Sequence, residues 1–353
     1  MLESKHAGVK HLLSRRRTYH VRMDVQTSNP WRLCVAPMMD WTDPHCRYFH
    51  RLLAPHARLY TEMVTAAALV RGARARLLAH NPEEHPVALQ LGGADPVELA
   101  AAARFGAEAG YDEINLNVGC PSDRVQSGRF GACLMREPEL VADCVRAMRE
   151  AVPVPVTVKC RIGVDDQDDD ADLFAFASRM LDAGVRVLIV HARKAWLQGL
   201  SPKQNREVPP LNYPRVYRLK QEFPGLTVVV NGGIDGLPAV EEHLRHVDGV
   251  MLGRLAYHDP FALARIDAAL FGGEPPLREA VLQRMRPYVE AARTRDVRLA
   301  SITRHVLGLY HGEPGGKAFR RALSERVQAT DAGWEAIEAA LLQVAARDRR
   351  VAA

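Results

Sequence analysis

Eight short apolar runs, separated by longer helical stretches, are the feature that most constrains this chain. They span residues 32–38, 58–64, 87–92, 113–118, 154–162, 187–191, 227–231 and 249–253. Near-continuous Val, Ile and Leu is typical of strands covered on both faces, and the alternation with helices indicates a parallel sheet. Because eight strands close a barrel, we predict an α/β fold, a (β/α)8 TIM barrel. An open doubly wound sheet would give similar runs.

The chain is longer than a barrel requires, and its charge is unevenly distributed. Its 353 residues exceed the roughly 250 of a typical barrel. Residues 1–22 carry six basic and one acidic side chain, residues 23–275 carry 27 and 32, and residues 276–353 carry 14 and 9. We therefore expect a basic, flexible N-terminal extension over residues 1–30, a catalytic barrel over residues 31–275, and a smaller C-terminal helical domain over residues 276–353.

The basic C-terminal segment suggests that this domain binds a polyanion while the acidic barrel does chemistry. Five of its arginines recur at spacings compatible with exposed helix faces: Arg284, Arg286, Arg293, Arg295 and Arg298. A solvated helical surface is the alternative interpretation.

Other classes of protein are disfavoured by the composition. No stretch approaches the roughly 20 apolar residues of a membrane-spanning helix, and the N-terminus lacks the apolar core of a secretory signal, so we expect a cytoplasmic protein. The six cysteines form no C-x-x-C pair, which favours free thiols and argues against a structural metal site.

Polar residues end nearly every apolar run, where the chemistry of a barrel collects. A strand interior gives little reason for such residues to recur in register, because unpaired buried polar groups are costly. A shared polar ligand would satisfy them. The residues at the ends of the runs are Ala36, Pro37 and Met38, then Thr61, Glu62, Gln90, Asn115, Asn117, Lys159, Arg161, His191, Arg193, Asn231, Gly232, Gly233, Gly253 and Arg254.

The glycines after the seventh and eighth runs indicate a phosphate site. Barrels typically hold phosphate there, where Gly232, Gly233 and Gly253 let backbone N–H groups approach and Arg254 adds a cation. Lys159 and His191 could donate hydrogen bonds to a ring with an anionic nitrogen, which suits FMN. Since no G-x-G-x-x-G opens the first βα unit, a nicotinamide reductant would bind only transiently.

A thiol, Cys120, sits between Gly and Pro in the loop after the fourth run, at the mouth of the inferred pocket. A lone cysteine is usually inert packing. The functional interpretation is a proton donor to the substrate.

Three stretches carry a resemblance to a known family: residues 35–43 (VAPMMDWTD), 115–122 (NLNVGCPS) and 191–196 (HARKAW), the last continuing into 199–203 (GLSPK). They resemble the tRNA-dihydrouridine synthases, in particular the A-type branch. The resemblance covers the chain from Trp31 onward and not the first thirty residues.

The resemblance implies an enzyme in which NADPH reduces FMN, the flavin passes hydride to C6 of a D-loop uridine, and Cys120 protonates C5. Positions 20 and 20a of tRNA are the implied targets. The implied FMN site comprises Ala36, Pro37, Met38, Gln90, Lys159, His191, Asn231, Gly232, Gly233, Gly253 and Arg254. The implied tRNA contacts are Asn117, Lys203, Arg206 and Arg304.

Three alternatives remain open from the residues themselves. An FMN-dependent dehydrogenase of a free pyrimidine explains the strand ends but not the basic C-terminal segment. A Schiff-base aldolase could use Lys159, as a lysine ending a barrel strand permits. An RNA-binding protein with an inactive barrel is disfavoured by the intact set of pocket residues.

Overall fold

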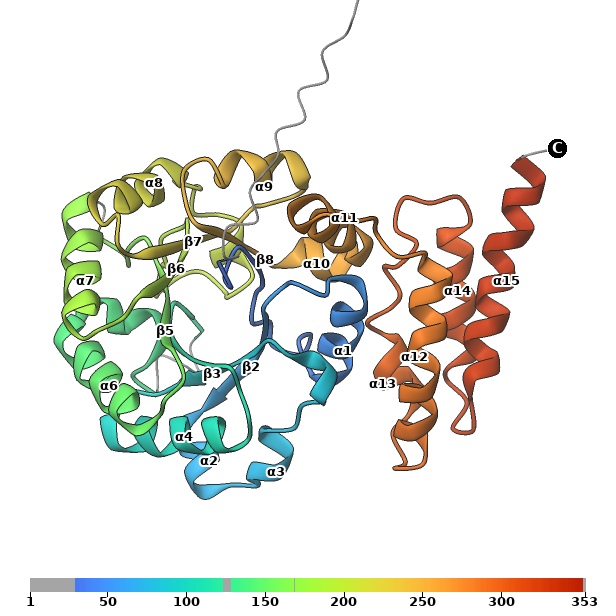
Figure 1. Cartoon of the computed structure of the whole chain (residues 1–353), viewed down its shortest axis with the longest axis horizontal. Coiled ribbons are helices and arrows are strands. Elements are labelled where there is room, and N and C mark those ends of the chain that lie inside the picture. The colour runs from blue at the N-terminus through green and yellow to red at the C-terminus, as the bar shows by residue number, and fades with distance from the viewer. Residues whose placement is uncertain (1–28, 123–127, 168, 352–353) are drawn as a thin grey trace, which may run out of the picture.

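Eight parallel strands form the body of the computed structural model, which describes residues 29–122, 128–167 and 169–351. In sheet order they run β1-β8-β7-β6-β5-β4-β3-β2. Their bounds are β1 Leu33–Val35, β2 Leu59–Thr65, β3 Val87–Gly92, β4 Glu113–Val118, β5 Val156–Arg161, β6 Val187–His191, β7 Thr227–Asn231 and β8 Gly249–Leu252. The N–H of Val35 donates to the Arg58 carbonyl and that of Arg58 to the Leu33 carbonyl, both at 2.9 Å. These bonds join β1 to β2 and close the ring, so the predicted barrel is confirmed (Figure 1).

Helices surround the ring and cover its outer face (Figure 1). The longer ones are α1 Pro44–Leu53, α4 Pro96–Glu108, α6 Pro138–Ala151, α7 Asp170–Asp182, α8 Tyr213–Glu222, α9 Leu237–His243 and α11 Pro260–Phe271. Shorter elements are α2 Ala66–Arg71, α3 Arg74–Leu77, α10 Arg254–His258 and the 3-10 helices η1 Pro82–Glu84, η2 Gly131–Arg136 and η3 Gln204–Arg206.

Local sequence explains where these helices begin. Asp95 caps α4 by accepting the N–H groups of Val97 and Glu98 at 2.8 and 2.9 Å, and Pro96 occupies the first turn, where a missing N–H costs nothing. The same arrangement of a capping Asp followed by Pro starts α1 and α11. The helix starts therefore follow from short sequence signals.

Two apolar layers hold the barrel together. The larger lies between the strands and the surrounding helices and includes fully buried Leu89, Leu116 and Val158. The smaller fills the ring interior, with Tyr60, Ile189 and Met251 among its members. Because both strand faces are buried, the strands consist of continuous apolar runs rather than alternating ones.

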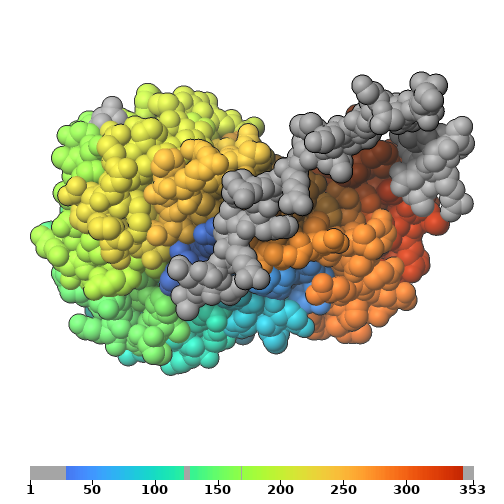
Figure 2. Space-filling view, turned by 45° about the horizontal axis from the view of Figure 1, so that its top comes forward, coloured from blue at the N-terminus to red at the C-terminus, as the bar shows by residue number. Residues whose placement is uncertain are grey.

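Four helices follow the barrel: α12 Arg278–Arg293, α13 Leu299–Thr303, α14 Gly316–Arg326 and α15 Trp334–Val351. They form a separate lobe beside the barrel (Figures 1 and 2), so the expected C-terminal helical region is present. Their core is continuous with α1, since Tyr48 stacks on Tyr288 at a centroid distance of 4.1 Å. The lobe is thus packed against one defined side of the barrel.

The structure refines three sequence-based expectations. The first strand stops at Val35 rather than Met38, because Pro37 has no N–H to donate to a ladder. The fifth strand is Val156–Arg161, shorter than the expected 154–162. The expected extension over residues 1–30 lies, apart from residues 29 and 30, outside the described residues. Within the described part of the chain, no helix has the length and apolar character needed to cross a bilayer.

Candidate active site

The strand register brings the predicted polar residues to one end of the ring. Gln90 pairs with Asn115 across β3 and β4, and Asn117 pairs with Lys159 across β4 and β5. His191 pairs with Asn231 across β6 and β7. Because all strands are parallel, these side chains share the C-terminal mouth of the barrel, where barrel enzymes place their chemistry.

Lys159 is a half-buried cation without a carboxylate partner among the described residues. Its Nζ donates to Oδ1 of Asn231 at 3.2 Å, and Nδ2 of Asn231 donates to the Met251 carbonyl at 2.7 Å. Burial and the nearby Arg161 lower the pKa of Lys159 to about 8. An ammonium held in this way favours an anionic group in the mouth.

His191 lies against the glycine turn that follows β7. Burial, followed by the charges of Arg161 and Lys159, lowers the pKa of His191 well below its usual value, so the ring is neutral at pH 7. A Cβ on Gly232 would lie 2.5 Å from Cδ2 and 2.8 Å from Nε2 of His191, and Gly232 has a φ of 110°. Glycine at residue 232 is therefore required by both the backbone and the imidazole.

The turn continues through Gly233, whose φ is 68°. Its neighbour Gly232 offers a carbonyl that accepts the Tyr213 hydroxyl at 2.7 Å. The turn after the neighbouring strand β8 is open, because among the described residues, its chain neighbours aside, only Cβ of Ala36 comes within 4 Å of a Cβ placed on Gly253, at 3.9 Å. Arg254 follows as the first residue of α10, and its Nη1 pairs with Oε1 of Glu207 at 2.8 Å, both side chains being about half exposed.

The predicted residues after β1 form a tight turn at the same mouth. Ala36 is buried and donates its N–H to the Leu252 carbonyl at 2.7 Å, so it extends the ladder by one bond. Pro37 follows, and the Met38 carbonyl accepts the N–H groups of Trp41 and Thr42 at 3.0 and 2.9 Å. Pro37 and Met38 therefore follow directly on the end of β1, and Met38 packs against the apolar residues inside the ring.

Cys120 lies on a backbone that is held from both sides. Oδ1 of Asn117 accepts the N–H groups of Gly119 and Cys120 at 3.0 and 2.9 Å, and the Cys120 carbonyl accepts the Ala132 N–H at 2.9 Å. The half-exposed thiol has the Ser122 hydroxyl 3.5 Å away. The loop continues through residues 123–127, which lie outside the described residues.

Cys133, the next cysteine along the chain, belongs to η2. Its Sγ donates to the Phe130 carbonyl at 3.2 Å, and burial together with Glu137 raises the pKa of its thiol. The two cysteines therefore differ in surroundings, with Cys120 on a loop and Cys133 in a helical turn.

Arg161, which the sequence placed among the strand-end residues facing a shared ligand, instead organises two loops. Its side chain is buried and donates to the carbonyls of Gly119, Lys194 and Asn205 at 3.1, 3.2 and 2.9 Å. These bonds tie the Cys120 loop to the long loop after β6. The sequence signal was present, since Arg161 ends a strand, but its carbonyl partners depend on the fold.

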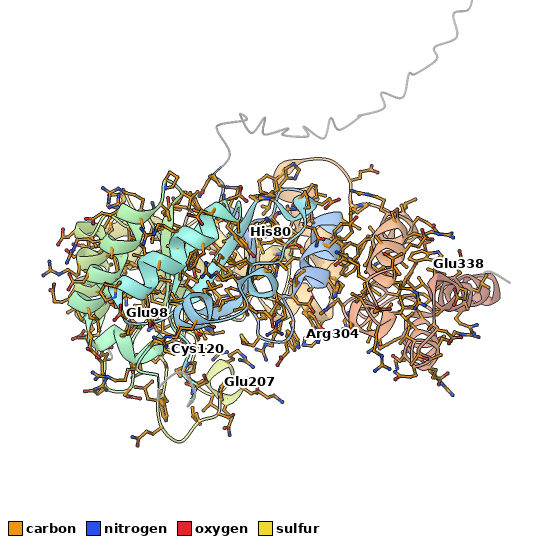
Figure 3. All side chains as sticks on the ribbon, turned by 90° about the horizontal axis from the view of Figure 1, so that it is seen from below. His80, Glu98, Cys120, Glu207, Arg304 and Glu338 are labelled. Atoms are coloured by element: carbon orange, nitrogen blue, oxygen red, sulfur yellow. The ribbon has the colours of Figure 1, made fainter. Side chains whose placement is uncertain are left out.

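The three predicted RNA-binding cations lie outside the barrel interior. Lys203 and Arg206 are exposed on the loop around η3. Arg304 lies between the barrel and the C-terminal helices, where its Nη2 pairs with Oδ2 of Asp43 at 2.5 Å. Figure 3 shows Cys120, Glu207 and Arg304 toward the same side of the molecule. The side with the barrel mouth therefore also carries cations from two regions of the chain.

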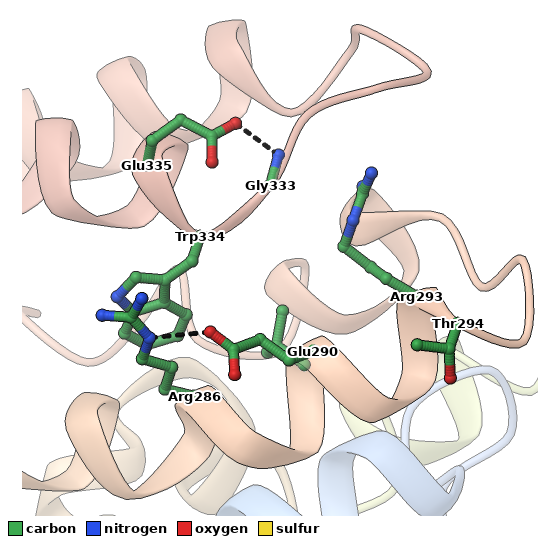
Figure 4. A pocket seen from close by; sticks show the side chains of 8 residues that line it. Arg286, Glu290, Arg293, Thr294, Gly333, Trp334 and Glu335 are labelled. Carbon is green, nitrogen blue, oxygen red and sulfur yellow. Dashed lines mark hydrogen bonds and ion pairs between the residues drawn. The ribbon is translucent and has the colours of Figure 1, made fainter.

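A separate hollow lies between α12 and the start of α15, away from the barrel (Figure 4). Its arginines are already engaged, since Nε of Arg286 donates to Glu290 at 2.8 Å and Nη2 of Arg293 to the Asp331 carbonyl at 3.0 Å. None of the residues at the barrel mouth whose pKa is shifted lines this hollow, so the mouth remains the candidate active site. Within the described ranges, no cluster of three or more His, Cys, Asp or Glu side chains is arranged as a metal site.

Comparison with known proteins connects this geometry to a family. The dihydrouridine synthase (Dus) family model matches residues 34–347. A tRNA-dihydrouridine(20/20a) synthase of Xanthomonas axonopodis pv. citri is 61% identical over 91% of this chain and 96% of its own. Proteins of the same description from Vibrio vulnificus and Salmonella typhimurium are 54% and 55% identical, each over 89% of this chain and 97% and 96% of their own.

Among solved structures, morphinone reductase in complex with tetrahydroNAD superposes with a TM-score of 0.48 and 14% identity, over 69% of this chain and 88% of its own. The sequence relationships are far closer than this structural likeness and extend through the barrel and the C-terminal helices. The chain belongs to the dihydrouridine synthase family.

Proposed function

We propose that this chain reduces uridine to 5,6-dihydrouridine in the D-loop of tRNA, at positions 20 and 20a, with FMN as bound cofactor and NADPH as reductant. The observation that carries the proposal is the 54–61% identity, over almost their full length, to relatives named for dihydrouridine synthesis at 20/20a. The barrel mouth supplies groups of the right kind for each part of this reaction.

The residues at the mouth fit a flavin mononucleotide. Among the described residues, Lys159 donates to the Asn231 amide and has no carboxylate beside it, and the nearby Arg161 adds positive charge, so an anionic ring edge would stabilise it. Neutral His191 and the Gln90 amide can each hydrogen-bond a heterocycle. Ala36, Pro37, Met38 and Asn231 complete the wall, and when bound the flavin supplies the hydride that C6 of uridine accepts.

The turns at Gly232, Gly233 and Gly253 would offer backbone N–H groups to a phosphate, and the space around Gly253 is open, with Cβ of Ala36 3.9 Å from a Cβ placed there. Arg254 is the cation beside them, and its present partner is the exposed carboxylate of Glu207. Exposed ion pairs contribute little to stability, so a phosphate can replace Glu207 at small cost.

Cys120 is the proposed proton donor. Hydride addition at C6 leaves negative charge at C5 and O4, and a thiol placed beside C5 can supply the proton that completes the single bond. Water then restores the thiol proton. The bonds from Asn117 to the Cys120 backbone fix the loop that carries the thiol, and one N–H of Asn117 remains for the nucleotide.

tRNA is the proposed substrate because exposed cations lie on the side of the molecule that carries Cys120. Lys203 and Arg206 are exposed around η3, and Glu207 directly after η3 lies on the same side as Cys120 and Arg304 (Figure 3). A base within a folded tRNA must leave its stack to reach Cys120, so the RNA has to be held by its backbone beside the mouth.

The absorption spectrum of the purified protein tests the cofactor. We expect flavin bands that disappear on addition of NADPH and release of FMN on denaturation. A protein without flavin that also fails to bind added FMN would contradict the proposal, and trapping of a carbonyl substrate on Lys159 by borohydride would then favour the aldolase. Reduction of free pyrimidines without tRNA would favour the dehydrogenase alternative.

A further inference from the structure

A continuous line of buried hydrogen bonds runs through the barrel from its floor to Cys120. It begins at Glu113, the first residue of β4, which is fully buried. Oε2 of Glu113 accepts the Trp31 indole N–H at 2.7 Å and lies 3.2 Å from Nη1 of Arg58. Oε1 accepts the hydroxyls of Tyr60 at 2.8 Å and Thr157 at 2.5 Å.

From Thr157 the line climbs through three amides. Nδ2 of Asn115 donates to Oγ1 of Thr157, Nε2 of Gln90 donates to Oδ1 of Asn115, and Nδ2 of Asn117 donates to Oε1 of Gln90, each at 2.8 Å. All four side chains are buried to nine-tenths or more. The last acceptor, Oδ1 of Asn117, holds the Cys120 N–H at 2.9 Å.

The direction of every bond in this line is determined by its two ends. At the floor, an indole and a guanidinium only donate, and burial with the charge of Glu113 raises the pKa of Tyr60 well above its usual value, so its hydroxyl donates too. A carboxylate surrounded by donors obliges Thr157 to donate its single proton. At the top, two backbone N–H groups can only donate, so Asn117 must present its oxygen to them.

Both ends impose the same orientation on the three amides between them. Thr157 retains only lone pairs for Asn115, which must present its NH₂, and each amide then presents oxygen to the one above. Reversing any single amide would place two donors or two acceptors face to face in a buried site, which is costly.

We infer that Glu113, Thr157 and Asn115 are positioning residues, which fix the orientation of the Gln90 and Asn117 amides and through them the placement of Cys120. This inference rests on the proposed role of Cys120 as proton donor. None of the three touches the reacting uridine, and their effect on the reaction passes through the line of hydrogen bonds.

Replacing Thr157 tests the line with little change of shape. Thr157→Val removes the hydroxyl and leaves the Asn115 NH₂ without an acceptor, whereas Thr157→Ser keeps the hydroxyl. We expect Thr157→Val to retain flavin and to slow single-turnover formation of dihydrouridine in saturating tRNA by about 10- to 100-fold, as displaced catalytic groups do. Thr157→Ser should keep most of the wild-type rate of dihydrouridine formation.

Thr303→Val is the matched control, because Thr303 is equally buried but lies in α13 and donates its hydroxyl to the Leu299 carbonyl. It should react at the wild-type rate. Glu113→Gln provides a second variant, since an amide at residue 113 faces donors on one of its two sides whichever way it turns. It should be slowed in the same way as Thr157→Val.

A double-mutant cycle with Cys120→Ala separates positioning from general damage. If the line acts through Cys120, Thr157→Val slows the wild-type background but adds no loss to Cys120→Ala. An equal loss in both backgrounds would overturn the positioning role alone. A wild-type rate for Cys120→Ala would overturn the proton donor and the positioning role together, and a wild-type rate for Thr157→Val would overturn the positioning role.

Discussion

Gly232→Ala is a direct perturbation of the proposed flavin site, because it adds one methyl group at a defined contact. The new Cβ would lie 2.5 Å from Cδ2 of His191 and 2.8 Å from its Nε2, whereas carbon atoms in contact usually lie about 3.5–4.0 Å apart. The φ of 110° is also one that a residue with a side chain rarely adopts. Both effects displace His191 or the turn that forms part of the proposed phosphate site.

The size of the loss in FMN affinity can be worked out from the backbone strain alone. Holding a residue other than glycine in a sparsely populated region costs about 1–3 kcal/mol. If the site relieves this strain by moving and forfeits that energy from binding, FMN affinity falls by about 5- to 150-fold. The contact with His191 adds to this loss, so a fall in FMN affinity of about fivefold is the minimum expected.

Flavin content after purification and titration of the apoprotein with FMN measure the effect. Gly225→Ala is the control, because Gly225 precedes β7 outside the mouth and, its chain neighbours aside, no atom of the described residues lies within 4 Å of its Cβ position. Its flavin content should equal that of the wild type. Wild-type FMN affinity in Gly232→Ala would refute the placement of the flavin beside His191.

Three further outcomes follow from the same geometry. Because the pKa of Lys159 is lowered to about 8, Lys159 loses its proton as the pH rises above that value, and FMN affinity should fall by up to about tenfold per pH unit. FMN affinity of Lys159→Met should not change over the same pH range. A wild-type FMN affinity that does not change above about pH 8 would contradict this. Cys120→Ala should keep a reducible flavin but form dihydrouridine about 10²- to 10⁴-fold more slowly, while Cys133→Ala, the control, should keep the wild-type rate. A slow Cys133→Ala and a fast Cys120→Ala would mean that Cys120 is not the proton donor. Charge removal from the C-terminal helices should weaken tRNA binding and reduce its salt dependence by about one unit of slope per lost phosphate contact, and unchanged slopes would contradict the RNA interface. The exposed residues to replace by Ala are Arg284, Arg295 and Arg298.

The barrel could be predicted because its signals are local. Continuous apolar runs such as Val187–His191 mark strands buried on both faces, and Asp-Pro pairs mark helix starts. The polar strand ends could be predicted for the same reason, since parallel strands place equivalent positions at one mouth. Lys159, His191 and Asn231 are brought together in this way.

The features that could not be predicted from the sequence depend on contacts between distant parts of the chain. Asp43 and Arg304 are 261 residues apart, and no local pattern indicates that they pair across the join between barrel and lobe. Burial alone would raise the pKa of Asp43, but His305 and the Arg304 guanidinium hold it well below its usual range. Glu113 is another such case, because a carboxylate at the start of a strand gives no sequence signal that three hydrogen-bond donors and the Arg58 guanidinium, all from other strands and loops, surround it.

Reduction of a defined tRNA by the purified protein tests the proposed reaction most directly. An unmodified transcript would be incubated with the holoenzyme and NADPH, and the gain of two hydrogens per modified uridine mapped by mass spectrometry of nuclease fragments. We predict dihydrouridine at positions 20 and 20a and none elsewhere, with no product when NADPH is omitted. A transcript left unchanged by the flavin-loaded protein, or modified only at other positions, would contradict the proposed function.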